Sequence, residues 1–530
     1  MWTPLEIDLS DLTDEQRNAV VSDDDYIVVL AGPGSGKTRV LTRRLEYLLK
    51  THGPAPIAVV TFTHKAAREL RSRIDLDPEL MAHVFVGTFH ALCARILRQD
   101  PRAVGLREGF SVFPRPQGRT EAEIRGYYLA TLLEEHIAKS GEKWTLSQAV
   151  TSLDWGSAKC KPLFLQNWSA ELIRRNMVDY ELLVELTLDL VENGNRGQWF
   201  DDVLVDEAPD TDDYEQRIIH AIGRKFFLVG DDWQSIYGWR GAYPEWLHAR
   251  QMDHPIHYLT LNHRSTQGIC DVLNRLMKNE EGADKKVLRS ALCLDNDIYI
   301  RDYHNPKEEA EEIAQLIKEE YRVSETAILS RTHARLDEIK VELTRQGIPV
   351  HAPDPIVERM KTEEFQGWLD KMRRNTVGDT LESLVNTIES LSPQANPGLR
   401  RLWSDTLILK DRYLRRCHET PTLFGFTQWI DNSHPDDLAE TDDLNGVFVN
   451  TIHAAKGLEF DSVFVVGLED GCLPQNRADT DYAEERRLLY VAMSRAKRNL
   501  YLCRCLETKA WPGAKKYTPV KESPFLEDVV

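Results

Sequence analysis

The sequence predicts an α/β fold in which parallel sheets are flanked by helices, divided over several domains. An apolar run at 26–30 leads through a glycine-rich turn into a helical pattern at 38–50 with leucines and a valine on one face. Similar apolar runs end in polar residues at 58–67, 84–90, 203–208 and 226–232. A chain of 530 residues with 42% hydrophobic content is too long for one core.

The glycine-rich turn is the first candidate site. Its glycines let backbone N–H groups surround a β-phosphate, Lys37 reaches the β- and γ-oxygens, and the Thr38 hydroxyl can hold Mg²⁺. The alternative is an ordinary strand-to-helix turn, which the flanking strand and helix argue against. The usual first glycine is an alanine here. The predicted ATP-binding residues of the turn are Ala31, Gly32, Gly34, Ser35, Gly36, Lys37, Thr38 and Arg39.

A short capped helix at 12–20 precedes the first strand, and its Gln16 offers both a donor and an acceptor to an adenine. Hydroxyls and rings at two later strand ends suit a single-stranded nucleic-acid track, because hydroxyls bind phosphates and rings stack on bases. The alternative is that the two phenylalanines are core residues. The candidates are Thr61, Phe62, Thr63, His64, Thr88, Phe89 and His90.

Two carboxylates follow the apolar run at 203–205. Asp206 is expected to hold Mg²⁺ and Glu207 to polarise the attacking water. An isolated Asp-Glu pair has little meaning, but a second run at 226–232 leads to Gln234, a neutral side chain able to sense a γ-phosphate. Together these residues predict hydrolysis of a nucleoside triphosphate.

Composition limits the class of protein. The net charge of −19 argues against a chain that coats nucleic acid non-specifically, although it leaves a local basic groove possible. The eight cysteines contain no CxxC pair, so reduced thiols are expected. An acidic N-terminus and the lack of a long uncharged apolar stretch predict a cytoplasmic protein with no membrane association.

Residues 229–242 resemble motif III of the UvrD/Rep/PcrA group of superfamily 1 helicases, while 61–67 and 87–93 resemble motifs Ia and Ib. The likeness implies that Tyr237, Trp239 and Arg240 face single-stranded DNA and that Gln234 faces ATP. Residues 261–266 are similar to motif IV, which implies that Arg264 contacts the γ-phosphate. His263 stands where the family commonly has tyrosine.

Three further segments resemble the second motor domain of that group. In 327–333, Arg331 and His333 stand in DNA-gripping positions. In 451–460, which looks like motif V, the likeness points Thr451 and His453 towards DNA and Glu459 towards the ribose. In 484–497, which matches motif VI, Arg495 is the implied arginine finger, a group worth about 10³–10⁵ in rate.

The resemblance implies two RecA-like P-loop motor domains, each with a mainly helical insertion. The expected boundaries are 1–93 and 201–252 for the first motor domain, 94–200 for its insertion, 253–375 and 444–530 for the second motor domain, and 376–443 for a short second insertion.

The predicted function is an ATP-dependent DNA translocase or helicase, with the 3′-to-5′ direction implied by the family, acting on single-stranded or tailed duplex DNA. The alternative is a DNA-stimulated ATPase subunit that unwinds little alone and works with a nuclease partner in anti-phage defence or repair. The short second insertion and Pro209, where the family pattern has glutamine, favour that alternative. A phosphate-loop kinase or GTPase explains neither the second motor half nor the segment around Tyr237.

Overall fold

The computed structural model describes the segments that form two α/β domains. These are residues 4–112, 169–170, 172–174, 176–193, 199–238, 241–249, 254–293, 297–351, 446–477, 480–509 and 517–529, with 365, 406–407, 409–410, 413–414 and 426. Within these residues no helix is long and apolar enough to cross a bilayer.

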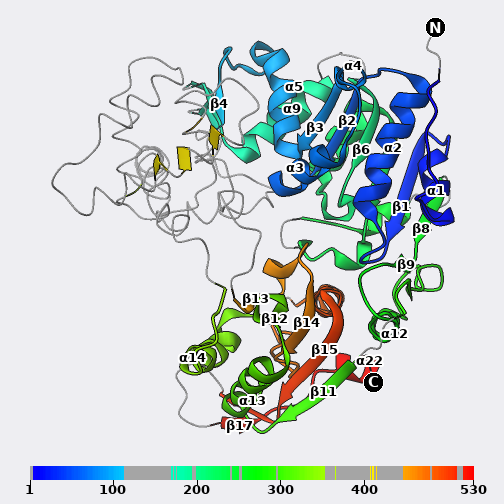
Figure 1. Cartoon of the computed structure of the whole chain (residues 1–530). Coiled ribbons are helices and arrows are strands. Elements are labelled where there is room, and N and C mark those ends of the chain that lie inside the picture. Colours follow the sequence, from blue (N-terminus) through cyan, green and yellow to red (C-terminus); the bar gives the residue numbers. More distant parts are fainter. Residues whose placement is uncertain are drawn as a thin grey trace, which may run out of the picture.

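The first domain is organised on a six-stranded sheet with the strand order β3-β2-β6-β7-β1-β8. All neighbouring strands are parallel, so their carboxyl ends meet at one edge. This edge faces the second domain (Figure 1). The strands are β1 (Tyr26–Ala31), β2 (Ile57–Thr61), β3 (Val84–Thr88), β6 (Phe200–Val205), β7 (Gly223–Gly230) and β8 (Ile256–Leu259).

Helices cover both faces of this sheet because alternate strand residues point to opposite sides. Ile27 and Val29 pack with one core cluster, which contains residues of α1 and α2, whereas Val28 and Leu30 pack with the other. The described helices of the domain are α1 (Asp14–Val21), α2 (Lys37–His52), α3 (His64–Arg73), α4 (Pro78–Met81), α5 (Phe89–Gln99), α9 (Tyr180–Asn193), α10 (Asp213–Ile222) and α11 (Glu245–Ala249).

The core of the first domain continues beyond residue 93, where the sequence placed the start of an insertion. Ile96 and Leu97 of α5, with Leu182 and Leu183 of α9, join the same buried cluster as strand residues of β1 and β2. Two short strands, β4 (Ser111–Val112) and β5 (Met177–Val178), form a parallel pair after α5 and before α9 in the chain. Much of the expected insertion at 94–200, including residues 113–168, lies outside the described residues.

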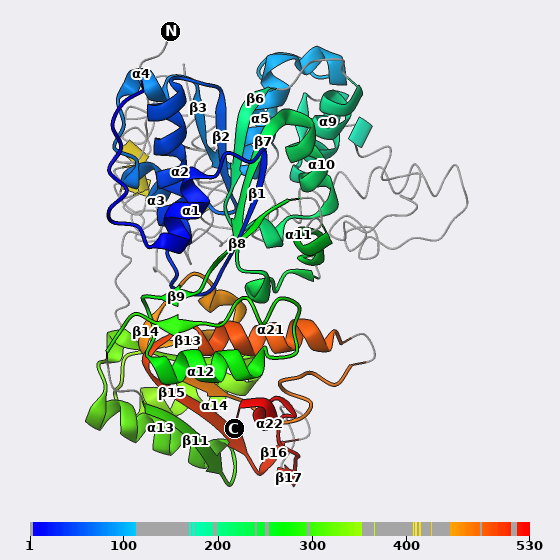
Figure 2. The ribbon, with the colours of Figure 1, turned by 90° about the vertical axis from the view of Figure 1, so that its right-hand side faces the viewer.

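The second domain contains a five-stranded parallel sheet in the order β11-β15-β14-β12-β13. Figure 2 shows α12 and α21 on the side of this sheet that also carries α22, with α13 and α14 on the other side. The elements are β11 (Asp297–Tyr303), β12 (Thr326–Ser330), β13 (Phe448–Thr451), β14 (Phe460–Val466), β15 (Ala496–Cys505), α12 (Gln267–Leu276), α13 (Pro306–Glu320), α14 (Asp337–Arg345), α21 (Tyr482–Met493) and α22 (Phe525–Val529).

The connection between the domains runs through β8 and a short strand, β9 (Leu261–Asn262), that pairs with β10 (Arg289–Ser290). Since β8 pairs with β1, the first sheet extends to Leu259, beyond the expected boundary at 252. Glu15 of α1 fixes the connection, because its carboxylate accepts hydrogen bonds from the Thr260 amide at 2.8 Å and from the Thr260 hydroxyl at 2.7 Å.

Candidate functional site

The glycine-rich turn joins β1 to α2 and adopts the backbone that its glycines permit. Gly34 and Gly36 have φ angles of +66° and +85°, a region that favours glycine. A Cβ atom on Gly34 would lie 2.6 Å from the Cβ of Arg264, and the Gly34 carbonyl accepts from the His263 amide at 2.9 Å. The turn therefore lies directly against the motif IV segment, which begins the second domain.

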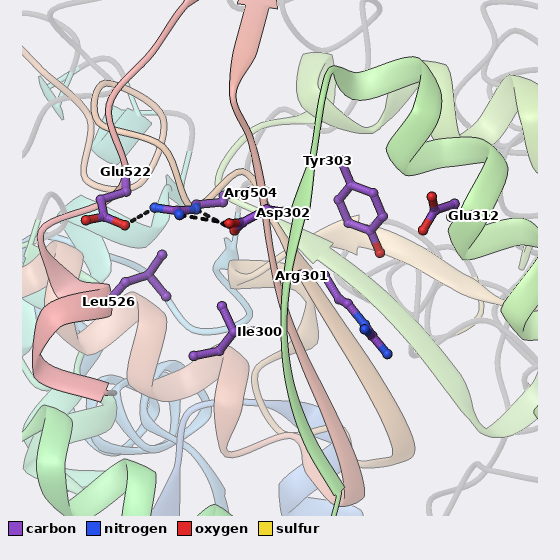
Figure 3. Close-up of a pocket in the computed structure, with 8 residues that line it drawn as sticks. All are labelled: Ile300, Arg301, Asp302, Tyr303, Glu312, Arg504, Glu522 and Leu526. Carbon is purple, nitrogen blue, oxygen red and sulfur yellow. Dashed lines mark hydrogen bonds and ion pairs between the residues drawn. The ribbon is translucent and has the colours of Figure 1, made fainter.

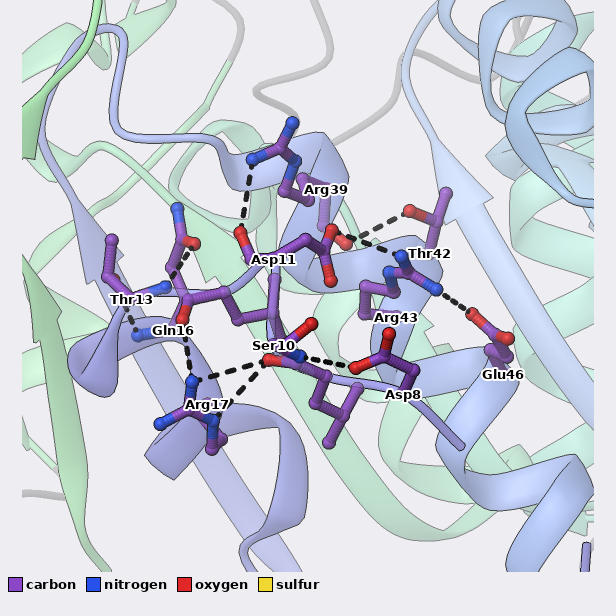
Figure 4. A network of polar contacts seen from close by, with 12 residues as sticks. Asp8, Ser10, Asp11, Thr13, Gln16, Arg17, Arg39, Thr42, Arg43 and Glu46 are labelled. Carbon is purple, nitrogen blue, oxygen red and sulfur yellow. Dashed lines mark hydrogen bonds and ion pairs between the residues drawn. The ribbon is translucent and has the colours of Figure 1, made fainter. Parts of the chain in front are cut away.

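Gln16 is held by the turn and by its own helix cap. Its side-chain oxygen accepts from the Thr13 amide at 3.1 Å, and its amide nitrogen donates to the Ser35 carbonyl at 2.8 Å. Figure 4 shows the capping box of Thr13 and Gln16 beside Arg39, whose guanidinium donates to the Asp11 carbonyl. Both Gln16 groups are thus engaged, and its contact with adenine stays a prediction.

Asp206 and Glu207 follow β6 at the carboxyl edge of the first sheet. Burial first, and the charge of Glu207 second, raise the pKa of Asp206 to about 7. Burial would also raise the pKa of Glu207, but the charges of Lys37, Lys456, Arg495 and Arg264 outweigh it, and that pKa lies below its ordinary value. Glu207 is therefore ionised at neutral pH, whereas burial and Glu207 outweigh the charge of Lys37 at Asp206.

The residues at this edge fit a magnesium–triphosphate group. Asp206 is a buried carboxylate at the carboxyl end of β6, and its oxygens are ligands of the kind that Mg²⁺ takes. Lys37 and Thr38 begin α2 beside it, at a helix N-terminus suited to phosphate oxygens. Glu207 has a φ of +51°, a strained backbone for a residue other than glycine, as often found at functional sites.

Arg495 enters this edge from the second domain. Its side chain is 2% exposed, and its Nη2 donates to the Gln234 side-chain oxygen at 2.7 Å. Its other guanidinium nitrogens donate to the Val491 and Leu458 carbonyls at 3.0 and 3.2 Å. Burial and the charge of Arg264 lower the pKa of Arg495 to about 9, so it stays charged at neutral pH.

Arg264 and Glu459 form an ion pair between motifs IV and V. The Arg264 Nε donates to Glu459 at 2.7 Å, and Lys497 lies 3.0 Å from the same carboxylate. Burial would raise the pKa of Glu459, but Arg264 and Lys497 hold it below its ordinary value. The structure therefore brings Arg264 to the nucleotide edge, while its role at a γ-phosphate and that of Glu459 at a ribose stay predictions.

Lys456 is an interdomain contact that the sequence did not single out. It lies in the motif V segment and forms an ion pair with Asp210, donates to the Gln234 carbonyl at 2.9 Å, and lies 4.7 Å from the ring centre of Tyr237. Lys456 stands between Ala455 and Gly457, and these neighbours give no sequence signal for a partner more than 200 positions away. One side chain thus contacts both the segment that follows Asp206 and Glu207 and motif III.

Three of the predicted DNA contacts have buried side chains in this structure, and their contact with DNA stays a prediction. Phe89 is 3% exposed within the core cluster that α5 and α9 share, as the core alternative expected. The Thr88 hydroxyl accepts from the Ala91 amide as the cap of α5, and Thr61 is 1% exposed. Phe62 stays partly accessible.

The remaining candidates of the first domain are only partly described. Thr63 is exposed and caps α3 by accepting from the Ala66 amide at 3.1 Å. The His90 ring packs edge-on against Tyr180 at 4.7 Å between ring centres. Tyr237 is partly buried under Lys456. Trp239, Arg240 and the side chain of His64 lie outside the described residues.

In the second domain the DNA candidates cluster at the carboxyl ends of β12 and β13. Thr451 ends β13, and His453 begins the next turn, beside Arg331. Arg331 donates to Glu485 of α21 at 2.8 Å, and part of its side chain remains exposed. His333, two residues further along the chain, is exposed. Their contact with DNA stays a prediction.

His453 predicts a pH dependence of stability. Burial first, then Arg331 and Lys456, lower its pKa from 6.5 to about 4, so the unfolded chain binds more protons than the folded chain between these values. The free energy of unfolding therefore falls as pH drops through this window, and His453→Gln should remove that part of the fall. Urea unfolding at pH 7.5 and 5 measures it. An equal fall in both proteins would contradict the assignment.

A separate pocket lies at the outer edge of the second sheet. It is lined by residues of β11, β15, α13 and α22, where Arg504 donates to Asp302 at 2.6 Å and pairs with Glu522 (Figure 3). None of its lining residues is a predicted site residue. The nucleotide edge between the two domains is therefore a different place in the molecule.

Comparison with known proteins identifies the family of this chain. The sequence model of the UvrD/REP helicase N-terminal domain matches residues 12–255, and that of the UvrD-like helicase C-terminal domain matches 257–369 and 378–507. Similar relatives are the ATP-dependent DNA helicases PcrA of Staphylococcus epidermidis and Staphylococcus aureus, each 26% identical over 98% of this chain and 86% of the relative. The two matches span most of the chain, which therefore belongs to the UvrD/REP helicase family of DNA-dependent ATPases.

Proposed function

We propose that the protein is an ATP-dependent DNA translocase and helicase that moves 3′ to 5′ on single-stranded DNA. Two motor domains with insertions near 94–200 and 376–443 would close on ATP·Mg²⁺ and open after hydrolysis. Polarity is carried over from the family resemblance, and the similarity to the ATP-dependent DNA helicases PcrA supports helicase activity on DNA.

The observation that supports this proposal most is the hydrogen bond between Arg495 and Gln234. It joins the motif VI helix end of the second domain to motif III of the first at 2.7 Å. The charges of Lys37 and Arg495 both lower the pKa of Glu207, so residues from both ends of the chain come near this edge. A site that is completed only when two domains meet makes hydrolysis depend on their closure.

Each residue at this edge then has a role in phosphoryl transfer. Bound ATP·Mg²⁺ supplies the reacting γ-phosphate and the metal charge. Asp206 and Thr38 would hold the metal, Lys37 the β- and γ-oxygens, and Glu207, ionised at neutral pH, would orient the attacking water. Arg264 and Arg495 would neutralise the charge that develops on the phosphoryl oxygens. Gln234 would pass the effect of that charge to the rest of motif III, which includes Tyr237.

A second candidate is a DNA-stimulated ATPase that unwinds little without a partner such as a nuclease. Pro209 favours it, because proline cannot donate the side-chain hydrogen bonds of the family's glutamine. Pro209 packs tightly on β7, where a Cβ on Gly230 would lie 2.1 Å from its ring, and its carbonyl accepts from Ser235 at 3.1 Å. The segment around Pro209 is thus joined to motif III by packing and one backbone acceptor.

Two assays on the purified chain separate these candidates. We expect ATP hydrolysis to rise at least about tenfold on adding single-stranded DNA, and a duplex with a 3′ tail to be unwound while one with a 5′ tail is not. Strong stimulation without unwinding of either duplex would support the second candidate. Hydrolysis that ignores DNA, or unwinding of only the 5′-tailed duplex, would contradict the proposed function or its direction.

A further inference from the structure

Lys286 is a buried lysine between α12 and β10, outside all the motifs. Its side chain is 1% exposed, and its ammonium lies 2.5 Å from a carboxylate oxygen of Asp231 and 2.5 Å from one of Asp232. It also lies 4.3 Å from the ring centre of Trp233. The two aspartates follow β7 of the first domain, whereas Lys286 belongs to the segment that follows α12, so the ion pair joins the two domains.

The contacts of Asp231 continue from Lys286 to the arginine finger candidate. One Asp231 oxygen receives the ammonium, and the other accepts from the Gln234 amide nitrogen at 2.7 Å. The Gln234 oxygen in turn accepts from Arg495. A carboxylate only accepts and a guanidinium only donates, so these two neighbours allow one orientation of the Gln234 amide.

The charge of Lys286 also offsets the electrostatic attraction between Asp231 and Arg495. Burial disfavours the ammonium of Lys286, but Asp231 and Asp232 outweigh it and raise its pKa, so it stays charged. Asp231 is one of the carboxylates that stabilise the charge of Arg495. Without Lys286, two buried carboxylates would lose their cation, and Asp231 would compete with Gln234 for the guanidinium.

We propose that Lys286 is a positioning residue for ATP hydrolysis, which holds Asp231 so that Gln234 presents its oxygen to Arg495. The inference rests on the proposed function, in which Gln234 and Arg495 act at the γ-phosphate. Lys286 is buried against Asp231, Asp232 and Trp233. It sets the orientation of a sensing side chain from the other domain, and its effect passes through Asp231.

The test is Lys286→Met, which keeps an unbranched side chain of nearly the same length and removes its charge. We expect kcat of DNA-stimulated hydrolysis to fall at least about tenfold while KM for ATP changes less than about threefold, because orientation in the transition state is lost. The double variant with Gln234→Ala should be no slower than Gln234→Ala alone by more than about twofold, since both act on one contact. Losses that multiply would overturn the proposal, as would an unchanged kcat.

Two controls separate this effect from loss of folding. Arg44→Met removes another buried cation, which donates to the Val20 and Ser22 carbonyls at 2.7 Å, and should lower thermal stability without lowering kcat. Lys286→Met with Asp232→Asn leaves the net charge of the cluster unchanged but still frees Asp231, so kcat should stay low; recovery to the wild-type kcat would overturn the proposal. A wild-type chain without DNA-stimulated hydrolysis would defeat the proposed function instead.

Discussion

Arg495→Ala should lower DNA-stimulated ATP hydrolysis by about 10³-fold or more, the usual worth of an arginine finger. The arginine is 2% exposed and reaches Gln234 from the second domain, and its pKa of about 9 keeps it charged at the working pH. Its loss removes a positive charge where the phosphoryl oxygens gain negative charge. The measurement is kcat at saturating ATP and single-stranded DNA.

Arg486→Ala is the matched control for this change. Arg486 lies on the same helix, α21, but its guanidinium donates to the Leu276 carbonyl at 2.9 Å and to Asp528 at 2.6 Å, which lie on helices of the second domain. We expect its kcat to stay within about threefold of wild type, as for an ordinary partly exposed ion pair. If Arg495→Ala kept a tenth of the wild-type rate, Arg495 would not be the finger.

The parts of the fold that the sequence predicted well are those with local signals. The strand, glycine turn and helix around Lys37 appear as β1 and α2, and the capped helix before them appears as α1. The apolar runs ending at Asp206 and Gly230 appear as β6 and β7. Parallel pairing then brings their carboxyl ends to one edge, which is why the nucleotide residues meet.

The burial of side chains at the end of β3 depends on packing against distant parts of the chain, so local sequence signals could not predict it. Phe89 is covered because α9, some 90 residues later in the chain, packs on α5. Nothing in the local pattern at Thr88 and Phe89 distinguishes a helix cap and a core ring from a hydroxyl and a ring that face DNA. Phe62, at the corresponding end of β2, stays partly accessible.

The interdomain ion pairs were also beyond local reasoning. Lys286 and Lys456 each meet carboxylates of the first domain, at sequence separations of more than 50 and more than 200 residues. Their partners, Asp231 and Asp210, stand in recognisable motifs, but a motif does not name the residue that neutralises it. Burial of a charge requires such a partner, so an unexplained motif carboxylate predicts a cation without saying which one.

Lys37→Ala should abolish measurable ATP hydrolysis and leave DNA binding without nucleotide close to wild type. Lys37 begins α2, and its charge lowers the pKa of Asp206 and of Glu207. Without it the phosphate oxygens lose their nearest flexible cation, and both carboxylates move towards the protonated state in which they neither hold a metal nor orient water. Steady-state hydrolysis and fluorescence anisotropy with labelled single-stranded DNA measure the two effects.

Lys50→Ala on the last turn of the same helix is the control, because Lys50, which pairs with Glu46 at 2.7 Å, lies at the opposite end of α2 from the glycine-rich turn. It should leave both measurements unchanged. The pair of assays also tests whether the two sites are assigned correctly. If Lys37→Ala weakened DNA binding but retained hydrolysis, the glycine-rich turn would be a nucleic-acid contact, and the Arg495–Gln234 contact would have no triphosphate to act on.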